Sequence, residues 1–322
     1  MQKEFLNLVS ACLDELGVAD LNFEVKECEF QNLGLLSTNA AFKLSKKLRD
    51  TGADTLPQDV ASRMLDTEKI KNSDFDVSLG GDGYLNATPS PEYIDRWLKS
   101  SICPEYFLIP PNVESVCDKV IWHNLYSRIK KSTDKEVLEF VSGRDLSLDD
   151  CLMLSAFFSD PETELTPYLE GLKGRQNIPW YLGKFLEDSE KILKQLNWDP
   201  EQSSNADLSK LDPRLSELLR AIMLFRGKVF GNGSVFEPVR GVGTLIFVVR
   251  NFYAFYNLPE CRAMLKNSSN KLPQFNICLL THVLRSMVGS SLELLQRSFT
   301  EGENKIRQEL GNNGNESKVH LS

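Results

Sequence analysis

The sequence is poor in the residues from which metal sites and disulfide frameworks are built. Its 322 residues include three histidines, none with a second histidine at ligand spacing. The seven cysteines are odd in number, scattered, and nowhere arranged as C-x-x-C. This pattern argues against a zinc site and against a disulfide framework. We therefore expect buried thiols, no metal ion and no cofactor.

Long apolar runs are also absent. No stretch approaches the roughly 20 apolar residues that cross a bilayer. The predicted first helix, from Met1 to Gly17, carries Asp14 and Glu15 within an amphipathic pattern, which is typical of neither a signal peptide nor an arginine-rich transit peptide. A cytoplasmic protein is expected, and the chain is long enough for two domains that each bury a core.

Positive charge is scarce over most of the chain. The formal net charge is -8, which by itself speaks against a polyanionic partner. Residues 213–297, however, contain eleven Lys or Arg and four Glu, a balance of +7, whereas residues 1–212 carry -14. A basic segment joined to an acidic one is the electrostatic footprint expected of a protein that holds a phosphate backbone through one end.

The first third of the sequence alternates helical and strand patterns, which predicts a small α+β domain over residues 1–99. Gly80-Gly81-Asp82-Gly83 lies between two predicted strands and favours a hairpin turn. The expected elements are a helix to Gly17, a strand over Leu21–Val25, a helix over Ala41–Leu48, a short helix opened by Pro57, strands over Phe75–Leu79 and Tyr84–Ala87, and a helix over Pro91–Trp97.

The remainder shows helical patterns only. Residues 100–175 have helical patches around 113–131 and 148–158 and are interpreted as a helical connector without an assigned fold. Residues 176–299 are predicted as an all-α bundle. Its expected helices cover 181–196, the segment after Asp212-Pro213, 244–257 and 273–297, with a break at 227–233. The polar residues 300–322 are predicted as a disordered tail.

One short segment combines a helix start with a cationic face. Asn39 stands at or just inside the amino end of the predicted helix, and the side opposite its apolar residues carries Lys43, Lys46, Lys47 and Arg49. An amide can hydrogen-bond base edges, while lysines and helix amino-terminal N–H groups can meet phosphates. The plainer interpretation is that Asn39 caps the helix and that the lysines form a solvated face.

A second set of side chains suited to RNA falls in the predicted bundle. Arg250 and Asn257 share one helix face, and Tyr256 lies among the aromatic residues around it. Unstacked bases are bound by aromatic faces and by Arg or Asn at their edges, although most aromatic residues of a bundle belong to its core. Arg285 and the segment Arg226-Gly227-Lys228, interpreted as a loop, add positive charge.

The two ends of the chain together resemble arginyl-tRNA synthetase. Ser37-Thr38-Asn39-Ala40-Ala41-Phe42-Lys43-Leu44 resembles the amino-terminal additional domain, which contacts the tRNA elbow. Residues 250–257 and 284–295 resemble the helical anticodon-binding domain called DALR. The catalytic core of that family is missing, because neither H-x-G-H nor K-M-S-K-S occurs and residues 100–175 are too few for a doubly wound nucleotide-binding core.

The resemblance implies a catalytically incomplete arginyl-tRNA synthetase paralogue. Such a protein would not be an enzyme. It would bind tRNA, tRNA-Arg by similarity, and present it to a partner such as a tRNA methyltransferase or a synthetase. The residues expected to contact RNA, from the resemblance and from their chemistry, are Asn39, Lys43, Lys46, Arg226, Lys228, Arg250, Tyr256, Asn257 and Arg285.

Two alternatives stay open. In one, the chain is a protein–protein subunit of a synthetase or tRNA-modification complex, and it uses its acidic amino-terminal surface without recognising RNA directly. In the other, Gly80-Gly81-Asp82-Gly83 marks a nucleotide-binding enzyme, since a similar segment occurs in lipid and NAD kinases. Four residues are a weak signal, and Gly83-Tyr84-Leu85-Asn86 also fits a hairpin of the additional domain.

Overall fold

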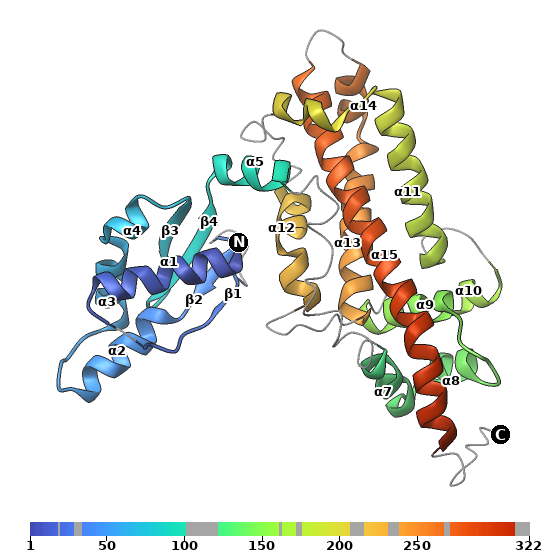
Figure 1. Cartoon of the computed structure of the whole chain (residues 1–322), viewed down its shortest axis with the longest axis horizontal. Helices are drawn as coiled ribbons and strands as arrows, with labels where there is room; N and C mark the ends of the chain where they lie inside the picture. Colours follow the sequence, from blue (N-terminus) through green and yellow to red (C-terminus); the bar gives the residue numbers. More distant parts are fainter. Residues whose placement is uncertain are drawn as a thin grey trace. The chain divides into compact units, whose positions relative to one another are not determined.

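The computed structural model describes residues 1–18, 20–28, 34–100, 122–160, 163–171, 176–206, 216–230, 238–266 and 271–312. The described residues form two compact units, the first containing residues 1–97 and the second starting at Leu98. Figure 1 shows helices gathered around a small sheet in the first unit and helices alone in the second. An α+β fold followed by an all-α fold is therefore confirmed in outline.

The sheet of the first unit has four antiparallel strands in the order β1-β2-β4-β3. The predicted hairpin is present, and its register runs from Phe75 opposite Pro89 to Gly80 opposite Tyr84. The elements are α1 (Gln2–Glu15), β1 (Val25–Glu27), β2 (Leu36–Thr38), α2 (Ala40–Asp50), α3 (Pro57–Leu65), α4 (Glu68–Lys71), β3 (Phe75–Gly80), β4 (Tyr84–Pro89) and α5 (Pro91–Ser100).

Two details of the first unit differ from the sequence prediction. The first strand begins at Val25 rather than Leu21, and the strand Leu36–Thr38 was not predicted. Both strands have only three residues, which is too short for an alternating pattern to identify them. Their positions are fixed by pairing, since Leu36 lies opposite Glu27 on one side and Ala87 on the other.

The second unit is a helical bundle whose long helices pack side by side (Figure 1). The rings of Phe185 and Phe252 meet edge to face in its core, with centroids 5.4 Å apart. Its helices are α7 (His123–Lys131), α8 (Lys135–Val141), α9 (Leu148–Ser159), α10 (Thr166–Leu169), α11 (Ile178–Gln195), the 3-10 helix η3 (Pro200–Asn205), α12 (Ser216–Phe230), α13 (Pro238–Tyr256), α14 (Pro259–Lys266) and α15 (Leu272–Asn312).

Part of the expected connector belongs to this bundle. Helix α9 begins with a capping box between Ser147 and Asp150, buries the run Cys151–Ala156, and packs against α13. A helix buried on all sides is typical of a core element. The predicted helical patch before His123 lies outside the described residues.

Two boundaries in the second unit also differ from the sequence prediction, and a third lies outside the described residues. Arg226, Gly227 and Lys228 lie within α12, so their interpretation as a loop is wrong. One glycine costs a helix about 1 kcal/mol, which the neighbouring residues can offset. Helix α15 continues past residue 299 to Asn312, so a disordered tail from residue 300 is wrong for this stretch. The expected start at Asp212-Pro213 lies outside the described residues, and α12 begins at Ser216.

The segment Leu272–Arg297 of α15 is long and apolar enough, by length and composition, to span a membrane, and an 18-residue window within it has a mean hydropathy of 1.2. The helix packs against α11 and α13 within the unit, and 56% of that window is buried. The core helix of a soluble bundle passes the same test, so this feature is weak evidence for a membrane span.

Candidate nucleic-acid interface

Helix α2 presents the first candidate surface. Its buried side is formed by small and apolar residues, among them Ala41 and Leu44. The side chains of Lys43, Lys46 and Arg49 are exposed. The predicted division of this helix into an apolar and a cationic face is therefore confirmed.

Asn39 is the N-cap residue of α2, but its side chain makes no capping hydrogen bond. Its Oδ1 instead accepts a hydrogen bond of 3.0 Å from the backbone N–H of Glu24. Asn39 therefore occupies the N-cap position, but its side chain does not cap the helix. The bond ties the chain ahead of β1 to the start of α2, and no described residue accepts a hydrogen bond from Nδ2. This amide nitrogen can donate to a ligand.

An aromatic pair beside this helix was not predicted as part of the surface. The rings of Phe42 on α2 and Tyr84 on β4 lie 4.8 Å apart and are tilted by 56°. Tyr84 is 47% exposed and lies opposite Gly80 at the tip of the hairpin. No local pattern in the sequence predicts this pair, because the contact between the two rings depends on where the hairpin packs against α2.

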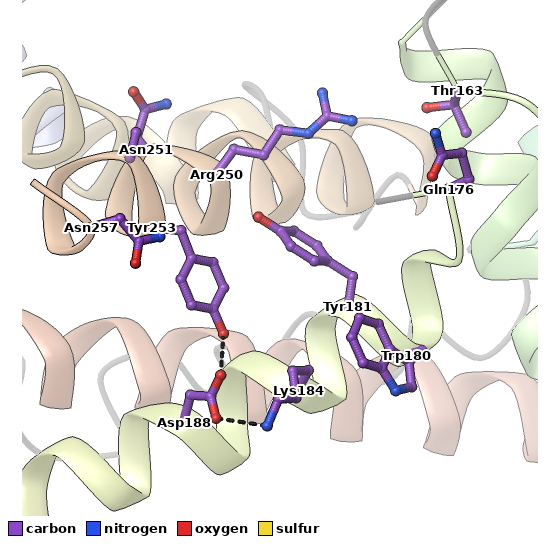
Figure 2. Close-up of a pocket in the computed structure, with 11 residues that line it drawn as sticks. Thr163, Gln176, Trp180, Tyr181, Lys184, Asp188, Arg250, Asn251, Tyr253 and Asn257 are labelled. Atoms are coloured by element: carbon purple, nitrogen blue, oxygen red, sulfur yellow. Dashed lines mark hydrogen bonds and ion pairs between the residues drawn. The ribbon is translucent and has the colours of Figure 1, made fainter. Parts of the chain in front are cut away.

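A cleft of about 850 Å³ between α11 and α13 forms the second candidate site (Figure 2). Two of the predicted RNA contacts, Arg250 and Asn257, line it together. None of the other nine lining residues was predicted as an RNA contact: Thr163, Gln176, Trp180, Tyr181, Lys184, Asp188, Asn251, Tyr253 and Ala254. The lining combines aromatic rings with amide, hydroxyl and charged groups.

The charges of the cleft are paired with one another. Arg250 Nη1 lies 2.7 Å from Asp160 Oδ2, and Lys184 Nζ lies 2.8 Å from Asp188 Oδ1. The Tyr253 hydroxyl donates a hydrogen bond of 3.0 Å to Asp188 Oδ2 (Figure 2). Burial acts to raise the pKa of Asp188, but the hydrogen bonds from Lys184 and Tyr253 outweigh it and leave the pKa lowered. Burial and the bond to Asp188 raise the pKa of Tyr253.

The remaining predicted contacts lie elsewhere. Tyr256 is partly buried and stacks on Phe252, with ring centroids 5.8 Å apart. Arg285 on α15 is 42% exposed and lies 3.4 Å from Glu190 of α11. Neither residue lines the cleft. The side chains of Arg226 and Lys228 lie outside the described part of the structure.

The basic segment does not form a unit of its own. Residues 98–207 contain twelve Lys or Arg and nineteen Asp or Glu, and the described residues among them belong to the same unit as the basic segment. The basic segment supplies Arg250 and Arg285, while the acidic part supplies their partners Asp160 and Glu190. The charge asymmetry along the sequence is therefore largely cancelled within the second unit.

No protein-family model, curated protein or solved structure matches this chain. Among the residues that the structure describes, no group of three or more His, Cys, Asp or Glu side chains is placed to hold a metal ion.

Proposed function

We propose that this chain binds tRNA and presents it to a partner enzyme, such as a tRNA methyltransferase or a synthetase. The resemblance of its two ends to arginyl-tRNA synthetase makes tRNA-Arg the expected class. The observation that carries the proposal is the surface formed by Asn39, Lys43, Lys46 and the Phe42–Tyr84 pair.

This surface offers each kind of contact that a folded RNA requires. Exposed lysines neutralise phosphates, and this provides most of the affinity. The Asn39 amide nitrogen is available to a base edge or a ribose hydroxyl, and an exposed ring such as Tyr84 suits an unstacked base. Cationic, amide and aromatic groups at one place favour RNA over an acidic protein, which would need only the cations.

The cleft of the second unit suits the other end of such a complex. Its cations are already paired with carboxylates, so it has little surplus charge for phosphates. Its lining includes the exposed ring of Trp180 and the exposed amide of Asn257, which are suited to bases that are splayed out of a loop.

Ultraviolet crosslinking followed by sequencing of the bound RNA tests the proposal. We expect tRNA to be enriched over ribosomal and messenger RNA, with tRNA-Arg foremost. Recovery of bulk RNA in proportion to its abundance would contradict the proposal. A protein partner that co-purifies after nuclease treatment, from a chain that binds no RNA, would favour the alternative of a protein–protein subunit.

A further inference from the structure

One end of the cleft between α11 and α13 contains an orphaned polar group. Thr163 lines the cleft and is 3% exposed, and its Oγ1 has no hydrogen-bond partner among the described residues. A buried hydroxyl without a partner is destabilising, because it has lost its hydrogen bonds to water and gained none in the fold. A ligand in the cleft would supply the missing partner.

Other polar groups converge on the same end. Figure 2 shows the side chains of Thr163 and Gln176 next to each other, with Arg250 extended toward them from α13. Arg250 Nη1 donates a hydrogen bond to Asp160, and no described residue accepts a hydrogen bond from Arg250 Nη2. The hydroxyl and the amide can each donate and accept, whereas the guanidinium only donates.

Two aromatic side chains of α11 also line the cleft. Trp180 is 38% exposed, and the Tyr181 ring lies 5.8 Å from the ring of Tyr253. The Asn177 side chain accepts a hydrogen bond of 3.1 Å from the backbone N–H of Trp180, which caps α11 and fixes its first turn. A planar heterocycle gains most from such rings, because it can stack on their faces.

The charge of the cleft restricts the ligand further. Arg250 and Lys184 are each matched by a carboxylate, Asp160 and Asp188. A phosphate would have to displace one of these carboxylates, whereas an uncharged ligand leaves both ion pairs intact.

We propose that the Thr163 end of the cleft binds one unstacked nucleobase. The edge of the base is held by Thr163 Oγ1, the Gln176 amide and Arg250 Nη2, and its face lies against the rings of α11. This inference rests on the proposed function in one respect, since the base is taken to belong to the bound tRNA. The same chemistry would also hold the base of a free nucleotide.

The substitution Thr163→Val separates a role in binding from a role in folding, because valine has nearly the same shape and lacks the hydroxyl. We expect its urea midpoint to equal or exceed that of the wild type, since an unpaired buried hydroxyl is removed. We expect its Kd for tRNA to rise about 3- to 10-fold, the effect of one lost hydrogen bond. Gln176→Ala, at an exposed position, should weaken binding similarly.

Thr244→Val is the matched control. Thr244 is buried on α13, and its hydroxyl donates to the carbonyl oxygen of Arg240 outside the cleft lining. Its loss should leave the Kd for tRNA unchanged. Calorimetry with the four ribonucleoside 5′-monophosphates tests whether the site binds the base of a free nucleotide as well as a base of tRNA.

Each outcome decides between the two proposals. If the wild type binds tRNA and both Thr163→Val and Gln176→Ala bind it equally well, the nucleobase site is refuted and the proposed function stands. If a mononucleotide binds in a way that depends on Thr163 while tRNA does not bind, the base site stands and the proposed function is refuted. Binding of neither tRNA nor mononucleotide refutes both.

Discussion

Arg250 of α13 and Asp160, the residue that follows α9, are joined by an ion pair of 2.7 Å. Their side chains are 32% and 24% exposed, so the pair is partly shielded from water. It links the basic and acidic stretches of the sequence and holds the guanidinium at the edge of the cleft. A residue chosen as an RNA contact therefore has a structural role as well.

Single substitutions at this pair should separate the two roles of Arg250. Both Arg250→Gln and Asp160→Asn remove the ion pair, so each should lower the free energy of unfolding by about 1–2 kcal/mol, measured by urea unfolding. Only Arg250→Gln removes the guanidinium, and with it Nη2, from the cleft, because the shorter glutamine amide does not reach the same position. We therefore expect it to raise the Kd for tRNA about 3- to 10-fold, while Asp160→Asn leaves the Kd equal or lower.

Equal effects of the two substitutions on the Kd would show that Arg250 acts only by stabilising the fold. The double variant provides the control on stability. Its loss of unfolding free energy should be smaller than the sum of the two single losses, because the same ion pair is removed in all three proteins.

The double substitution Lys43→Gln with Lys46→Gln tests the surface of α2. Both side chains are exposed, so stability should change by less than about 0.5 kcal/mol. Two lost phosphate contacts should reduce the slope of log K against log salt concentration by roughly 1.5. Filter binding between about 50 and 200 mM salt covers the range in which such a slope is measurable.

Lys69→Gln is the matched control for the lysine pair. Lys69 is exposed on α4 of the same unit, outside the proposed surface. It removes one charge from the unit, so a general effect of net charge would appear in this variant too. If the slope of log K against log salt concentration falls by the same amount per removed charge in both variants, the lysines of α2 do not contact the RNA directly.

Asp188 makes part of the stability of the second unit dependent on pH. Its pKa in the folded chain lies below the ordinary value of 3.8, because the hydrogen bonds from Lys184 and Tyr253 outweigh burial. Its contribution is therefore fully present above about pH 4 and is lost as the pH falls through the folded pKa. Asp188→Asn should lower the urea midpoint at pH 7, and the wild-type and variant midpoints should converge toward pH 2. Asp145→Asn, at an exposed position, should not show this convergence.

Local signals in the sequence were enough for the hairpin and for the long helices. Residues from Phe75 to Ala87 alternate in polarity around a glycine turn, and α11, α13 and α15 have apolar residues at helical spacing. The lysine face of α2 was predictable for the same reason. Gly227 has a low intrinsic helix propensity, so the sequence pattern predicts a helix end there. The residue nevertheless lies within α12.

Local sequence patterns could not predict the contacts that define the two candidate surfaces. The Asn39 side chain bonds the backbone of Glu24, 15 residues away, and Arg250 bonds Asp160, 90 residues away. Pairs at these separations depend on the packing of whole elements, and a charge count over 213–297 cannot show that an acidic segment folds against it. The base site likewise depends on Thr163, a residue without any periodic or motif signal.

The turn between β3 and β4 gives the last prediction and tests the alternative of a nucleotide-binding enzyme. Gly83 has a φ of +125°, and an added Cβ would lie 2.6 Å from the Cβ of Pro57 in α3. Gly81 has a φ of +52° and open space around it. We expect Gly83→Ala to cost about 2–3 kcal/mol of unfolding free energy from strain and clash, and Gly81→Ala only about 1 kcal/mol from backbone strain.

Packing thus explains Gly83 without a bound phosphate, and we expect millimolar ATP to leave the thermal midpoint unchanged. A nucleotide that binds the folded chain must raise that midpoint in proportion to the logarithm of its concentration. If ATP raised the midpoint of the wild type and not that of Gly81→Ala, the turn would hold a phosphate, because the alanine methyl group at this open position blocks a ligand without disturbing α3. Equal midpoints with and without ATP in both proteins would leave the turn a structural element that fixes the hairpin, and with it Tyr84, against α3 and α2.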